Sequence, residues 1–104
     1  MSDRQMANGE CTAIVAYEVR AEDRDRFLNA WDRANEHLQT QPGYVGNTLH
    51  EAVSANPDFR FVNIARWKSV DDFRAATQSS TFYEASGWLE AYPIHPAVYD
   101  VVRS

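Results

Sequence analysis

With 104 residues, 44% of them hydrophobic and 12% aromatic, the chain has the length of one domain and enough apolar side chains for a packed core. Fifteen acidic against ten basic residues give a formal net charge of -5, which excludes the basic surface that nucleic-acid binding requires. The single cysteine, Cys11, excludes an internal disulfide and fits no zinc-site spacing, so we expect a domain of the reducing cytoplasm, held together by packing.

The polar residues 1–9 lack the apolar run of a secretory signal or a membrane span. We therefore expect a flexible N-terminal tail, no membrane association, and one domain over residues 10–104. The first strand is predicted at Cys11–Arg20, which is rich in β-branched and aromatic residues. Its apolar side chains occupy both odd and even positions, which indicates a strand covered on both faces.

The segment Ala21–Gln41 changes to a helical period. Its apolar side chains recur at i, i+4, i+7 and i+11, at Phe27, Trp31, Ala34 and Leu38. Acidic residues in its first turn suit the helix dipole, and Pro42 and Gly43 predict its end.

A hairpin is predicted next. Its strands are Tyr44–Val53 and Phe59–Trp67, and both contain many β-branched and aromatic residues. The intervening segment Ser54–Asp58 has the composition of a turn. A loop this short makes the two strands neighbours in the sheet.

A second helix is predicted after Ser69, a good N-cap residue that two aspartates follow in the first turn. Thr81 and Glu84 have the spacing of a capping box, which predicts a further helical segment at Phe82–Leu89. Pro93 and Pro96 are predicted to bracket a loop. The last strand is then expected at Ala97–Arg103.

The order β-α-β-β-α-β is that of an α+β ferredoxin-like fold, in which two helices cover one face of an antiparallel sheet. The predicted strands carry apolar residues on both faces, so the face without helices must also be covered. A second copy of the same sheet would do this, and we expect a two-fold homodimer.

The predicted strand Phe59–Trp67 carries the most informative polar residues. Alternation places Asn63 and Trp67 on one face, with Phe61 and Ala65. A buried carboxamide and a buried indole N–H both need hydrogen-bond partners. Together they could hold a polar substrate oxygen, although residue types alone also fit an ordinary core.

Three stretches, QPGYVGNTLHEAV, FRFVNIARWKSVDDFRAA and HPAVYDVVR, resemble the antibiotic biosynthesis monooxygenase family. The resemblance extends from Thr12 to Arg103, and its most specific part is the N-x-x-x-W pattern at Asn63 and Trp67. It implies a dimeric α+β barrel that oxidises phenolic or anthrone-type polyketide intermediates to quinones with O₂, without metal, flavin or haem. It also implies that Asn63 and Trp67 are the catalytic pocket residues.

Some family members use an assisting tyrosine and arginine, and no obvious counterparts exist here. Phe73 and either Ser86 or Gly87 stand near the corresponding positions. The resemblance therefore leaves the exact substrate open.

Two histidines are candidates for proton transfer, because an imidazole titrates near neutral pH. His50 lies an even number of positions from Tyr44 in the same predicted strand. It is a candidate catalytic proton acceptor. His95 precedes the last predicted strand and is a candidate at the pocket mouth. Aromatic side chains that could contact a flat ligand are Tyr17, Phe73 and Trp88.

Two alternative functions stay open. Haem-degrading monooxygenases share this dimeric fold, but they resemble one another in a first-strand Asn and a second-helix His that this chain lacks. The other alternative is a non-enzymatic small-molecule binding module, or a related protein with a different substrate, because one fold hosts many activities.

Overall fold

The computed structural model describes residues 10–79 and 91–104. The predicted tail 1–9 and the predicted helical segment 82–89, with Trp88, lie outside the described residues. The described elements follow in chain order: β1 (Cys11–Tyr17), η2 (Ala21–Asp23), α1 (Arg24–Leu38), β2 (Tyr44–Glu51), β3 (Phe61–Trp67), α2 (Val70–Thr77) and β4 (Ile94–Tyr99).

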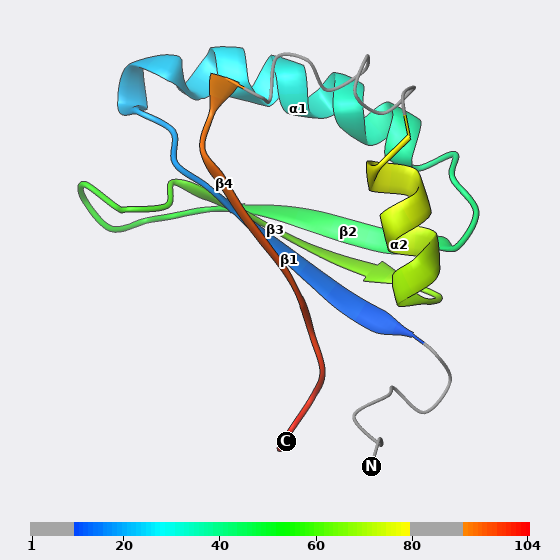
Figure 1. Cartoon of the computed structure of the whole chain (residues 1–104). Coiled ribbons are helices and arrows are strands. Elements are labelled where there is room, and N and C mark those ends of the chain that lie inside the picture. The colour runs from blue at the N-terminus through cyan, green and yellow to red at the C-terminus, as the bar shows by residue number, and fades with distance from the viewer. Residues whose placement is uncertain (1–9, 80–90) are drawn as a thin grey trace.

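The four strands form one antiparallel sheet in the order β2-β3-β1-β4. Both helices lie on the same side of the sheet, α1 lengthwise and α2 at one end (Figure 1). This is the ferredoxin-like α+β fold that the sequence predicts. We call the face toward the helices the inner face and the opposite one the outer face.

The β1–β3 register places the residues of the inner face. Val15 pairs with Asn63, and Ala13 pairs with Ala65. Directly opposite residues of antiparallel strands point to the same face. All four of these side chains therefore point toward the helices, as the predicted alternation requires for Asn63.

A β-bulge between Tyr44 and Gly46 interrupts the alternation in β2. Tyr44 pairs with Trp67 on the inner face, whereas His50 pairs with Val62 on the outer face. His50 and Tyr44 therefore lie on opposite faces, although an even number of positions separates them in the sequence. A bulge adds one residue to a strand, which reverses the side-chain direction beyond it.

The predicted limits of the last strand were wrong. β4 begins at Ile94 and ends at Tyr99, so it includes Pro96, which the sequence analysis assigned to a loop boundary. Pro96 pairs with Val15 of β1. β4 is an edge strand of the sheet, where a residue without a backbone N–H is tolerated.

One part of the core forms around Phe27, which is completely buried. Its ring stacks on Phe61 with centroids 4.6 Å apart, and it meets the rings of Tyr17 and Tyr92 edge-on at 4.9 and 5.4 Å. The predicted apolar stripe of α1 is confirmed, because Phe27 and Ala34 are buried. None of the helices within residues 10–79 and 91–104 is long and apolar enough to cross a membrane.

The start of α2 is fixed by its N-cap. The Ser69 hydroxyl accepts a hydrogen bond from the backbone N–H of Asp72 at 3.0 Å, as the sequence predicts. Nearby, Gly43 in the α1–β2 turn has a φ of +87° and accepts a hydrogen bond from the Lys68 N–H at 2.8 Å. A Cβ at Gly43 would overlap the side chain of Asp72, so this turn and the first turn of α2 are in direct contact.

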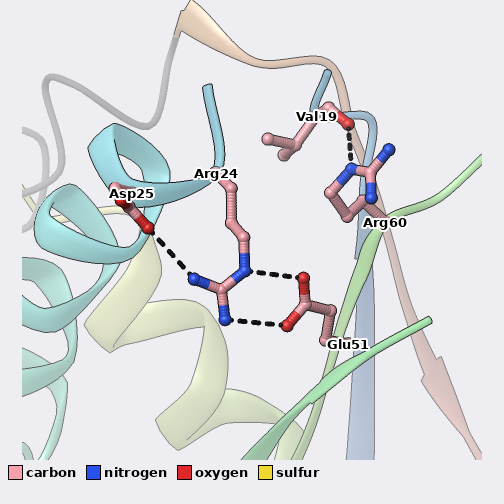
Figure 2. Close-up of polar contacts among 5 residues, drawn as sticks. All are labelled: Val19, Arg24, Asp25, Glu51 and Arg60. Carbon is pink, nitrogen blue, oxygen red and sulfur yellow. Dashed lines mark hydrogen bonds and ion pairs between the residues drawn. The ribbon is translucent and has the colours of Figure 1, made fainter. Parts of the chain in front are cut away.

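An ion pair joins the start of α1 to the end of β2 (Figure 2). The Arg24 guanidinium donates to both carboxylate oxygens of Glu51, at 2.8 and 3.0 Å. This hydrogen bonding lowers the pKa of Glu51. In the same view, the Nε of Arg60 donates to the Val19 carbonyl at 2.9 Å and ties the hairpin to the segment after β1.

We expect Gly43→Ala to lower the free energy of unfolding by about 2 kcal/mol or more, because it combines a positive φ with a steric overlap. Urea denaturation followed by circular dichroism measures this change. Gly46→Ala is the control, since a Cβ at Gly46 meets no atom within 4 Å. Equal losses in the two variants would contradict the described contact with Asp72.

We expect Glu51→Gln to lower the melting temperature at neutral pH but not in acid. The lowered pKa of Glu51 means that its contribution is present at neutral pH and is lost as the pH falls through its folded-state pKa. The difference in melting temperature between wild type and variant should therefore shrink from about pH 6 to about pH 3. Glu36→Gln on the exposed side of α1 is the control, and a pH-independent difference for Glu51→Gln would contradict the assignment.

Candidate functional site

A cavity of about 630 Å³ lies between the inner face of the sheet and α2. This volume is in the range of small-molecule sites. The cavity exists partly because two alanines, Ala13 and Ala65, lie opposite each other on its floor where larger side chains would fill the space. Its walls are mostly apolar, which suits a flat aromatic ligand.

Asn63 lies on this floor and is only 6% exposed. It pairs with Val15 on one side and Leu49 on the other, so its immediate strand neighbours are apolar. Its Oδ1 is buried and has no hydrogen-bond partner among the residues that the structure describes. A buried acceptor without a partner destabilises the fold by about 1–3 kcal/mol, which makes it a candidate for binding a ligand.

Trp67 lines the same cavity two strand positions beyond Ala65 and is 1% exposed. Its ring meets Tyr44 edge-on at 5.7 Å and Phe73 at 5.9 Å. These contacts from β2 and α2 hold the indole in one orientation. The structure thus brings Asn63, Trp67 and Phe73 to one cavity.

A hydrogen-bonded chain that the sequence analysis missed borders the cavity. The Tyr44 hydroxyl donates to Oδ1 of Asn47 at 2.5 Å, and Nδ2 of Asn47 donates to Oδ1 of Asn35 at 2.7 Å. Asn47 and Asn63 both line the cavity, but only Asn47 has its amide satisfied in this way. The hidden bulge in β2 prevented the sequence from assigning Tyr44 and Asn47 to the inner face.

Tyr17 also lines the cavity. Burial raises the pKa of Tyr17 to about 12, and a hydrogen bond with Trp31 offsets part of this increase. Its hydroxyl therefore stays protonated at neutral pH and can contact a ligand without acting as a base.

The two candidate histidines lie outside the cavity. His50 is on the outer face opposite Val62. His95 pairs with Ala16 on the outer face, and its Nε2 lies 2.7 Å from the Glu18 carboxylate. Among the described residues that line the cavity there is no carboxylate and no imidazole.

The α2 wall contributes the polar edge of the cavity. Phe73, Arg74, Thr77 and Gln78 line it from successive turns of the helix. Arg74 is exposed and carries the only charge among the described lining residues. Sequence reasoning missed Arg74, although its position next to Phe73 could have indicated it.

A second depression of about 770 Å³ lies beside η2 and the β2–β3 loop. Its charged residues of both signs include the Arg20–Glu22 ion pair at 2.7 Å. In the described part of the chain, no group of three or more His, Cys, Asp or Glu residues could hold a metal ion. The cavity around Asn63 is the better candidate site, because its walls are mostly apolar and it contains a buried acceptor without a described partner.

Comparison with known proteins gives a family match and close structural neighbours. The family model described as antibiotic biosynthesis monooxygenase matches residues 11–88. No curated protein sequence matches the chain.

Two solved structures with at least 25% sequence identity share the fold. A protein of Shewanella loihica PV-4 that is proposed to be a monooxygenase is 28% identical, with a TM-score of 0.81 over 92% of this chain and 97% of that one. SnoaB of Streptomyces nogalater, described as a cofactor-independent oxygenase, is 25% identical, with a TM-score of 0.79 over 92% of this chain and 96% of that one.

A dimeric ferredoxin-like protein of unknown function from Jannaschia sp. CCS1 is also similar. It is 16% identical, with a TM-score of 0.73, and the match covers 89% of this chain and 100% of that one. At this identity the likeness concerns the fold alone.

We expect Asn63→Leu to raise the free energy of unfolding by about 1 kcal/mol, because it removes a buried acceptor that lacks a partner. Asn47→Leu is the matched comparison in the neighbouring strand. It should lower the free energy of unfolding by about 1–3 kcal/mol, since Tyr44 and Asn35 lose their partner. Urea denaturation of the ligand-free protein measures both, and a loss of stability in Asn63→Leu as large as in Asn47→Leu would show that Asn63 is satisfied.

Proposed function

Because this chain belongs to the antibiotic biosynthesis monooxygenase family, we propose that it is a cofactor-independent monooxygenase that oxidises a phenolic or anthrone-type aromatic compound to a quinone with O₂. The description of SnoaB as a cofactor-independent oxygenase supports the reaction type. The observation that carries the proposal is the buried Oδ1 of Asn63, without a partner among the described residues, in an apolar cavity beside Trp67.

The carboxamide of Asn63 suits a substrate that changes its protonation state. Its oxygen accepts a hydrogen bond from a phenol O–H, and its NH₂ group, after rotation, donates to the phenolate. The indole N–H of Trp67 supplies a donor to a second oxygen. Fixed donors in a mostly apolar cavity stabilise the charge that develops on oxygen during the reaction.

The chemistry needs no redox group on the protein. An electron-rich phenolate transfers one electron to O₂, and the resulting substrate radical and superoxide combine to form a peroxide. Loss of water then leaves the new carbonyl of the quinone. For an anthrone, the balance is one CH₂ group and O₂ converted to one C=O group and H₂O.

The fate of the substrate proton follows from the composition of the cavity wall. The described lining residues include no carboxylate or imidazole, so the histidines His50 and His95 are not part of this proposal. In this mechanism the protein stabilises the anion, and the proton leaves to solvent through the cavity mouth. Tyr17, Trp67 and Phe73 bind and orient the ring.

We also propose that the protein is a homodimer in which a second copy covers the outer face. Ile64 and Tyr99 on this face are 38% and 51% exposed in the single chain. Their partners in the sheet are Ile14 and Thr12, so apolar side chains from β1, β3 and β4 lie together there. Sheet-to-sheet packing would form a dimeric α+β barrel, and a monomer mass in analytical ultracentrifugation at micromolar concentration would contradict it.

The alternative function is ligand binding without oxidation. The lack of a carboxylate or an imidazole on the described cavity wall favours it, because general-base catalysis would otherwise be available. Haem degradation is not favoured, since neither β1 (Cys11–Tyr17) nor α2 (Val70–Thr77) contains the Asn and His that such enzymes share.

We expect oxygen consumption that tracks quinone formation when metal-free protein is mixed with anthrones or dihydroxynaphthalenes. Asn63→Ala and Trp67→Phe should each lower kcat/KM by about tenfold or more, because each removes a hydrogen bond to the developing anion. An oxygen electrode with chelator and anaerobic controls measures this.

Gln39→Ala, at the exposed end of α1, is the control variant and should behave as wild type. Binding of the same compounds without oxygen uptake above the uncatalysed rate would favour the alternative. Unchanged turnover in both site variants would remove Asn63 and Trp67 from the mechanism.

A further inference from the structure

We propose that the ligand of the cavity carries a carboxylate, which Arg74 binds at the cavity mouth while the aromatic ring lies over Ala13 and Ala65. This inference rests on the proposed aromatic ligand of the same site, but it does not depend on the oxidation. It assigns to the site a substrate class, an aromatic acid, and to Arg74 a specificity-determining role.

Arg74 differs from three other arginines of the chain, because its guanidinium has no polar partner among the described residues. Arg24 is bound by Glu51, Arg66 lies 2.6 Å from Glu10, and Arg60 donates to the Val19 carbonyl. The guanidinium of Arg74 has no hydrogen bond or ion pair with any described residue. It is therefore a cation that lines a mostly apolar cavity and has no side-chain polar partner among the described residues.

Three carbonyl groups near the end of α2 accept hydrogen bonds from donors other than Arg74. The Thr77 hydroxyl donates to the Phe73 carbonyl at 2.9 Å, and the Ser79 hydroxyl donates to the Ala76 carbonyl at 3.2 Å. The backbone N–H of Gln78 donates to the carbonyl of Arg74 itself at 2.9 Å. With these acceptors occupied, the guanidinium is available to a ligand.

The position of Arg74 suits a carboxylate physically. An ionised group deep in the cavity would lose its hydration at a large cost in free energy. At the exposed mouth, the same group keeps part of its hydration. A guanidinium binds a carboxylate with two parallel hydrogen bonds. Gln78, the C-cap residue of α2, also lines the cavity and is a further candidate donor to a carboxylate.

The charge of the whole chain makes a local cation favourable for such a ligand. A formal net charge of -5 repels anions at long range, and a nearby positive charge offsets this repulsion for an aromatic acid in the cavity. Phe73 is in ring contact with Trp67, and Arg74 is the next residue along α2. The cavity thus offers a mostly apolar floor with Asn63 and, on its α2 wall, Arg74 as the one cationic group among the described lining residues.

The test compares two quinones that are not oxidised further, anthraquinone-2-carboxylate and anthraquinone-2-carboxamide. Their affinities for the whole protein are measured by titration calorimetry. We expect wild type to bind the carboxylate more tightly than the amide. Arg74→Gln should weaken carboxylate binding by about five- to tenfold and leave amide binding unchanged.

Arg33→Gln is the matched control, because Arg33 is exposed on α1, does not line the cavity, and loses the same charge. It should leave both affinities unchanged. Raising the salt concentration should weaken carboxylate binding to wild type and not to Arg74→Gln.

Equal affinities of wild type for the two quinones, or the same loss in Arg33→Gln as in Arg74→Gln, would overturn the inference. Failure of both quinones to bind would also overturn it. If carboxylate binding depends on Arg74 but no substrate causes oxygen uptake, the result would support this inference and reject the oxygenase function.

Discussion

The antiparallel pairing of β1 with β3 is the constraint on which the candidate site depends. Its register sets Val15 against Asn63 and Ala13 against Ala65, so the inner face presents a carboxamide next to two very small side chains. The small side chains leave a cavity, and the carboxamide gives that cavity a polar floor. A shift of one residue in this register would turn Asn63 to the outer face and close the site.

Asn63 illustrates how a binding site conflicts with stability. A leucine would suit its apolar neighbours better, and the Oδ1 that lacks a described partner is a defect of the ligand-free fold. Such defects persist in proteins where function requires them. The surrounding structure compensates, because Trp67 is held by two aromatic contacts and Asn47 accepts a hydrogen bond from Tyr44 and donates one to Asn35.

The sequence predicts the features that depend on local periodicity and capping. The strand alternation around Asn63, the apolar stripe of α1 and the Ser69 N-cap all follow from such patterns, and together they determine the fold. The bulge in β2 and the strand position of Pro96 depend on pairing across the sheet, which a single sequence does not display. For the same reason, the sequence did not place His50 on the outer face, and it gave no sign that Arg74 is unpaired in the described fold.

The contact between Gly43 and Asp72 affects the cavity although neither residue lines it. The α1–β2 turn touches the first turn of α2, the helix that forms the polar wall, so residues outside the cavity lining help to set the position of this wall. Positions 43 and 72 should consequently covary among relatives. A residue larger than glycine at position 43 should occur only with a residue smaller than aspartate at position 72. For protein engineering, this pair is a point at which the space above the sheet could be widened for bulkier ligands without altering any side chain that a ligand touches.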